Sequence, residues 1–127
     1  MRATVVDASA LAAVLFDEPE AAPVLASVRG VLIAPSLIRY ELASVCVTRM
    51  IRHPERMEQI ENRYRLPGSL ALELVEPDWD RLPALARRWQ LSAYDAAYLE
   101  IALARNAPLV TLDARLAAAW EAASGTA

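Results

Sequence analysis

Short apolar runs alternate with amphipathic segments along the chain, and this alternation predicts its secondary structure. Three of the runs are rich in Val, Leu and Ile, which is typical of strands buried on both faces of a parallel sheet. A fourth apolar run contains Glu73. The predicted strands are 3–6, 31–35, 70–75 and 109–112.

Helices are predicted between these strands, because apolar residues recur there every three or four positions. Asp7 or Ser9 is a candidate cap for the first helix, and Ser36 for the third. Gly30 is expected to close the second helix, and Pro67-Gly68 the fourth. The predicted helices are 9–16, 20–29, 37–52, 54–65, 78–89, 93–105 and a last one that continues through 117–127 and frays at 124–125.

Strands that alternate with helices favour βαβ units, in which the strands are parallel and the helices cover the sheet. A chain of 127 residues can bury one sizeable core. We therefore predict an α/β protein with a three-layer α/β/α fold, a short, mainly parallel central sheet and helices on both faces. The whole chain, 1–127, is expected to form one domain.

The residue types available restrict any metal chemistry. Cys46 is the only cysteine, which excludes an internal disulfide and a thiolate zinc cluster. His53 is the only histidine, and Pro54 after it indicates a helix end rather than a metal ligand. A metal ion would therefore need oxygen ligands, which suits Mg²⁺ or Mn²⁺.

Charge and hydropathy bear on location and partners. Arg2 is the only charged residue before Asp7 interrupts the first apolar run, so we expect no signal peptide. No apolar segment approaches the ~20 residues that span a bilayer, so we expect no membrane contact and a cytoplasmic protein. The formal net charge is -3, which argues against general affinity for nucleic acid. All 13 basic residues are arginines, however, and six lie within 39–65. Arginine suits bidentate phosphate contacts, and the alternative is an ordinary solvated helical surface.

Four acids occupy positions where a carboxylate needs a partner. Asp7 and Asp113 directly follow predicted strands, at the sheet edge where open α/β folds bind ligands. Asp95 lies on the apolar arc of one predicted helix, and Glu41 on the apolar stripe of another. Clustered carboxylates raise one another's pKa unless a cation neutralises them. A divalent cation does so, and can also activate water and bind a phosphoryl oxygen.

Structural explanations exist for two of these acids. Asp7 would be sufficiently explained as a helix cap, although capping does not require a buried strand end. Glu41 would be explained by an ion pair with Arg49, which falls near the same helix face. A metal site and these structural roles are therefore both open at this point.

The four acids lie in four motifs, and it is the order and spacing of these motifs that is specific. The motifs are Val-Val-Asp7-Ala-Ser9-Ala-Leu, Tyr-Glu41-Leu-Ala-Ser, Ala-Tyr-Asp95-Ala-Ala-Tyr-Leu and Leu-Val-Thr111-Leu-Asp113-Ala-Arg-Leu. Over nearly the whole chain the sequence resembles the PIN-domain ribonucleases, and among them the VapC toxins of bacterial type II toxin–antitoxin systems.

The resemblance implies a PIN-like fold and a metal-dependent endoribonuclease. The catalytic and metal-binding residues that it implies are Asp7, Glu41, Asp95 and Asp113, with Mg²⁺ or Mn²⁺ as cofactor and with Ser9 and Thr111 as supporting hydroxyls. The first three acids would hold the metal and Asp113 would orient the attacking water. Some relatives carry a further acid where Ala117 and Ala118 stand here, so one or two metals are possible.

The resemblance also implies partners. It implies a homodimer, an RNA substrate for which tRNA is one candidate, and a cognate VapB-type antitoxin that blocks the acidic pocket. Candidate contacts to the RNA or the antitoxin are Arg39, Arg49 and Arg52.

Two other functions deserve comparison with the ribonuclease. A catalytically silent PIN-like module that binds RNA or protein would not need four acids, and metal-dependent cleavage would separate it from an enzyme. A phosphotransfer domain of the receiver or haloacid-dehalogenase type also places an aspartate after its first strand. Those families use a lysine near the phosphate, and this chain has none.

Overall fold

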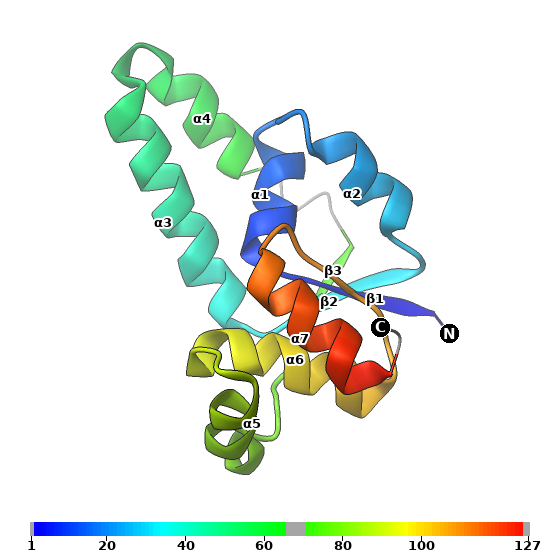
Figure 1. Cartoon of the computed structure of the whole chain (residues 1–127). Helices are drawn as coiled ribbons and strands as arrows, with labels where there is room; N and C mark the ends of the chain where they lie inside the picture. Colours follow the sequence, from blue (N-terminus) through cyan, green and yellow to red (C-terminus); the bar gives the residue numbers. More distant parts are fainter. Residues whose placement is uncertain (1, 66–70, 126–127) are drawn as a thin grey trace.

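The computed structural model describes residues 2–65 and 71–125, in which helices lie on both faces of a four-stranded sheet (Figure 1). All the strand pairs are parallel and the strand order is β3-β2-β1-β4. The strands are Ala3–Val6 (β1), Val31–Ala34 (β2), Leu72–Leu74 (β3) and Leu109–Val110 (β4). The predicted three-layer α/β/α fold with a short parallel sheet is thus confirmed.

The helices follow the predicted order, and two of them are preceded by 3₁₀ turns. The turns are Pro54–Arg56 (η1) and Trp79–Arg81 (η3). The α-helices are Ala8–Leu15 (α1), Ala21–Ser27 (α2), Leu37–Arg52 (α3), Met57–Tyr64 (α4), Leu82–Trp89 (α5), Ala93–Arg105 (α6) and Ala114–Ser124 (α7). None of the helices in the described ranges is long and apolar enough to cross a lipid bilayer.

Several predicted element ends differ from the structure. Ser36 precedes α3 but makes no capping side-chain bond, because its backbone is already helical (φ -57°, ψ -24°). The amides of Ile38 and Arg39 donate instead to backbone carbonyls three residues earlier. β4 stops at Val110, short of the predicted 112. The predicted end at Pro67-Gly68 and the first residue of strand 70–75 lie outside the described residues.

Gly30 does not close α2 as predicted, because that helix ends at Ser27. Gly30 lies beyond it, in the left-handed region (φ +73°), just before β2. A Cβ atom there would lie 2.1 Å from the carbonyl oxygen of Arg2. The same oxygen accepts a hydrogen bond from the amide of Val31 (3.0 Å), at the start of the β1–β2 ladder. The glycine therefore permits this close strand pairing.

We predict that Gly30→Ala lowers the free energy of unfolding by about 2–4 kcal/mol, since backbone must move to admit the methyl group. Urea denaturation measures the loss. Gly125→Ala is the matched control. Gly125 has a similar φ of +76°, but a Cβ atom there would have no neighbouring atom within 4 Å. Its expected cost is about 1 kcal/mol. Equal losses in the two variants would contradict this role for Gly30.

The sheet order brings together two chain segments that are far apart in the sequence. β1 is central and pairs with β4 so that Val6 lies opposite Val110. The segments that follow these two strands therefore leave the same edge of the sheet side by side. α6 packs against β1, and α7 packs against β4. This edge is where the predicted acids are found.

Candidate active site

Asp7 leaves the carboxyl end of β1 with only 6% of its surface exposed. Its Oδ1 accepts hydrogen bonds from the amide of Ala10 (3.0 Å) and from Ser9 Oγ (2.7 Å). Its Oδ2 accepts from Thr111 Oγ1 (2.5 Å), beyond the end of β4. Asp7 therefore caps α1, as its structural explanation predicted, and also joins the ends of two neighbouring strands.

Ser9 and Thr111 fix the loop after β4 against the start of α1. The Ser9 hydroxyl accepts from the amide of Leu112 (2.9 Å) and lies 3.4 Å from Thr111 Oγ1. Thr111 Oγ1 in turn accepts from the amide of Asp113 (3.0 Å). The hydroxyl of Thr111 therefore makes hydrogen bonds to Asp7 and Asp113, and β4 ends one residue earlier, at Val110. Both hydroxyls lie where supporting residues were expected.

Asp113 begins α7 as its N-cap. Its Oδ1 accepts from the amides of Arg115 (2.9 Å) and Leu116 (3.3 Å). A carboxylate in this position also interacts favourably with the helix dipole. One carboxylate oxygen of Asp113 therefore has a structural role.

Glu41 projects from the second turn of α3, where its Oε1 accepts a hydrogen bond from Tyr98 of α6 (2.5 Å). Burial raises the pKa of Glu41, and the negative charges of Asp95 and Asp7 raise it further, while the bond from Tyr98 lowers it. The alternative explanation of Glu41, an ion pair with Arg49, is wrong. Arg49 lies eight positions later, about 12 Å along the helix, and pairs with Glu18 instead.

Asp95 lies in the first turn of α6, where its amide donates to the Oγ of Ser92 (3.1 Å). Burial raises the pKa of Asp95, and the charges of Asp113 and Asp7 add to the rise. The Ser92 hydrogen bond and the positive charge of Arg115 act in the opposite direction. The pKa of Asp95 is therefore raised in part by acids that belong to two other elements.

These shifts connect the four predicted acids through Asp95 and Glu41, whose pKa values respond to the charges of the other acids. The charge of Asp7 acts on both Glu41 and Asp95, and that of Asp113 acts on Asp95. Within residues 2–65 and 71–125, however, no three His, Cys, Asp or Glu side chains stand close enough to form a ready metal-binding group. Like charges without a counter-ion disfavour closer approach, and Asp7, Glu41 and Asp113 are each turned toward a hydrogen-bond donor.

The residues at this edge fit a hard divalent cation by their chemistry. Every acidic side chain offers carboxylate oxygens, the ligands that Mg²⁺ and Mn²⁺ prefer. Burial is the main cause of the raised pKa values of Glu41 and Asp95, and the negative charges of neighbouring acids add to both rises. A cation would lower both pKa values and draw the carboxylates together.

Two buried residues with roles at or near this edge were missed by the sequence interpretation. Tyr98 is 1% exposed and its phenol, whose pKa is raised by burial, donates to Glu41. Its position three residues after Asp95 on the same face of α6 was the available signal.

Glu100 is 3% exposed, accepts from the amide of Asp78 (2.9 Å) and lies 3.7 Å from Arg81. These contacts tie the start of η3 to α6, and Glu100 is structural.

The three arginines singled out as candidate contacts do not converge. Arg39 lines a cavity of about 370 Å³ together with Tyr64 and Leu74. Arg49 lines a different cavity, beside Phe16. Arg52 is exposed at the end of α3. The Arg-rich segment therefore presents separate surfaces.

Comparison with known proteins agrees with this fold. The PIN domain family model matches residues 4–121. Ribonuclease VapC9 of Mycobacterium tuberculosis and a VapC ribonuclease of Mycobacterium bovis are each 35% identical over 119 residues, which is 88% of this chain and 87% of theirs. The crystal structure of PAE2754 from Pyrobaculum aerophilum has the same fold, with a TM-score of 0.73 at 22% identity over 98% of this chain and 96% of that one. The chain therefore belongs to the PIN-domain family and, within it, to the VapC ribonucleases.

Proposed function

We propose that this VapC-family protein is the toxin of a toxin–antitoxin pair and hydrolyses RNA at the edge of the sheet where Asp7, Glu41, Asp95 and Asp113 meet. The observation that carries the proposal is that the charges of Asp7 and of acids from other elements raise the pKa values of Glu41 and Asp95. A binding module gains nothing from such repulsion, whereas a metal-dependent nuclease needs it. We further propose Mg²⁺ or Mn²⁺ as the cofactor.

Each acid has a role that follows from its position. Asp7, Glu41 and Asp95 would hold the cation, directly or through waters, and Asp113 would orient the attacking water. Ser9 and Thr111 hold Asp7 in place by hydrogen bonds. When bound, the cation supplies charge neutralisation and a lowered pKa of water.

Water rather than the ribose 2′-hydroxyl is the nucleophile in this proposal. The reason is that a divalent cation held by the acids would supply an activated water, which Asp113 would orient. Attack by water on phosphorus breaks the bond to the 3′-oxygen. The products then carry 5′-phosphate and 3′-hydroxyl ends.

Incubation of the purified protein with total cellular RNA tests this proposal. We expect discrete fragments with 5′-phosphate ends in Mg²⁺ or Mn²⁺ and none in EDTA. Mapping these ends identifies the substrate, for which tRNA is one candidate. Silence of a preparation free of copurified antitoxin, at every metal concentration, would favour the catalytically silent binding module instead.

We also propose that the protein forms a homodimer and binds a VapB-type antitoxin. An exposed apolar stripe on α3 supports the dimer: Tyr40, Val47 and Ile51 are 76%, 54% and 74% exposed and share one helix face. The negative charges of the four acids at the proposed site would attract a basic side chain of the antitoxin. Sedimentation velocity gives the mass of the free protein, and a monomer at micromolar concentration would refute the dimer.

Tyr98→Phe is predicted to move the acidic limb of the pH–rate profile to higher pH. The phenol lowers the pKa of Glu41, so removing it raises that pKa and Glu41 is protonated over a wider pH range. Rates measured across the pH range at saturating metal reveal the shift. Tyr94→Phe is the control, because Tyr94 is exposed. An acidic limb unchanged in Tyr98→Phe would show that the phenol does not tune Glu41.

A further inference from the structure

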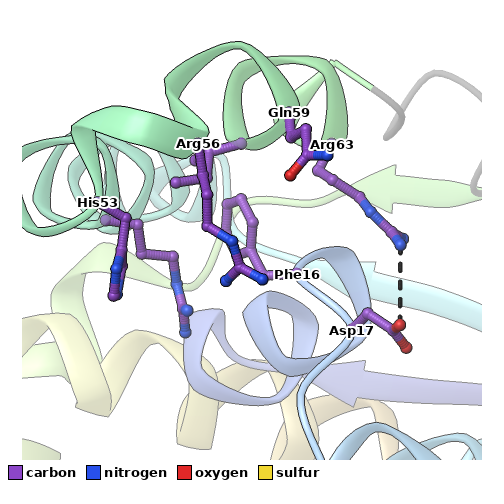
Figure 2. A pocket seen from close by; sticks show the side chains of 8 residues that line it. Phe16, Asp17, His53, Arg56, Gln59 and Arg63 are labelled. Atoms are coloured by element: carbon purple, nitrogen blue, oxygen red, sulfur yellow. Dashed lines mark ion pairs between the residues drawn. The ribbon is translucent and has the colours of Figure 1, made fainter.

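A second polar cavity lies away from the four acids, between the end of α1 and the hairpin formed by α3 and α4 (Figure 2). Its volume is about 280 Å³. Basic side chains enter it from three successive elements, namely α3, η1 and α4. The residues that matter for its chemistry are Phe16, Asp17, Arg49, His53, Arg56 and Arg63.

This cavity is basic although the chain as a whole carries a net charge of -3. Arg49 pairs with Glu18, and Arg63 lies 3.8 Å from Asp17. Arg56 forms no ion pair with any residue that the structure describes. Of the charged residues that line the cavity, three are arginines and one, Asp17, is a carboxylate, while Glu18 and Glu55 pair with Arg49 and His53 from outside the lining. Figure 2 shows the side chain of Arg56 lying above Phe16, toward the centre of the cavity. A local excess of positive charge favours an anion.

Arg49 is held in place before any ligand arrives. Its guanidinium stacks over the ring of Phe16, 4.9 Å from the centroid, while it pairs with Glu18. Its Nε atom is buried and has no hydrogen-bond partner in the described part of the chain. A fixed guanidinium loses little freedom when it binds an anion, and its planar fork matches two phosphate oxygens.

The same two helices connect this cavity to the acids. α1 carries Ser9 in its first turn and is followed directly by Phe16, and it packs against α3. α3 carries Glu41 near its start and Arg49 about 12 Å further along. An RNA strand bound at the acids would therefore have to extend by about this length to reach the cavity.

We propose that this basic cavity binds a backbone phosphate of the RNA substrate, away from the bond that is cut. This inference rests on the proposed ribonuclease function. The acids repel a polyanion, so a substrate phosphate held by arginines outside the acidic site offsets that repulsion. An RNA backbone fits these features better than an acidic peptide, because several guanidinium forks around a polar cavity match phosphate geometry.

The test measures binding of two fluorescent single-stranded RNAs to the Asp95→Asn variant, which keeps the RNA intact. One RNA extends well beyond the mapped cleavage site on both sides, and the other is trimmed to the few nucleotides around it. Arg56→Gln and Arg63→Gln are then added together. The matched control adds Arg87→Gln and Arg105→Gln, two exposed arginines in α5 and at the end of α6. Figure 1 shows both helices away from α4. Circular dichroism checks that all variants remain folded.

We expect the cavity variant to bind the long RNA about three- to tenfold more weakly, with a salt dependence shallower by about 1.4 for two lost single-strand phosphate contacts. The short RNA and the control pair should show no change. Equal binding of the long RNA by variant and parent would overturn the inference, as would an equal loss on both RNAs. So would a variant that binds RNA normally but no longer binds the antitoxin. Failure of the wild-type protein to cleave RNA would refute the proposed function. A long unstructured RNA needs no mapped site, and its binding by the cavity variant and its parent then still shows whether the cavity holds an RNA phosphate.

Discussion

The Asp95→Asn variant is expected to lose RNA cleavage by about 10²- to 10⁴-fold while remaining folded. Asparagine has nearly the same shape as aspartate but carries no charge, so it weakens the hold on a divalent cation. The amide of residue 95 still donates to Ser92, which preserves the start of α6. Initial rates on the mapped substrate, at saturating Mn²⁺, measure the loss.

Asp80→Asn is the matched control for this experiment. Asp80 is an exposed acid in η3 and belongs to none of the four motifs. Its variant should cleave RNA like the wild type. A comparable loss in both variants would mean that net charge, rather than the acidic site, governs the rate. An Asp95→Asn variant with activity within a few-fold of the wild type would remove Asp95 from the site.

The second large effect concerns stability without metal. The pKa values of Glu41 and Asp95 are raised in the folded protein above the ordinary 4.5 and 3.8, chiefly by burial. The folded state therefore holds these protons more tightly than the unfolded state does. The resulting stabilisation is present at low pH and is lost as the pH rises through the raised pKa values.

We accordingly predict that, in EDTA, Asp95→Asn melts a few degrees above the wild type at about pH 8, and that the difference shrinks as the pH falls toward the raised pKa of Asp95. Mn²⁺ at pH 8 should raise the melting temperature of the wild type more than that of the variant, because ligand binding stabilises the folded state in proportion to affinity. Thermal melts at several pH values, with and without Mn²⁺, test both statements. A difference independent of pH would contradict the electrostatic explanation.

The strand–helix alternation was enough to predict the fold, because buried parallel strands have a simple sequence pattern. The location of the acids could be predicted for the same reason, since Asp7 and Asp113 follow such strands. Contacts across the sheet edge could not be predicted in the same way. The Thr111–Asp7 hydrogen bond joins residues 104 positions apart, and it depends on β4 lying beside β1.

The errors have local physical causes. Ser36 resembles a cap by residue type, but a turn already satisfies the first amides of α3. Arg49 was expected beside Glu41, yet α1 and its following turn offered both an aromatic ring and Glu18. Glu100 was overlooked because its partners, the amide of Asp78 and the guanidinium of Arg81, come from a segment about 20 positions earlier. In each case the deciding partner belongs to another element.

Direct titration of metal-free protein with Mn²⁺, followed by the electron paramagnetic resonance signal of the free ion, tests the central claim that the four carboxylates form one cation site. The wild type and Asp80→Asn should bind Mn²⁺ saturably and with equal affinity. Glu41→Gln and Asp95→Asn should each bind at least about tenfold more weakly, since each removes one anionic ligand. Equal affinity in all four proteins, or no saturable binding by the wild type, would contradict the claim.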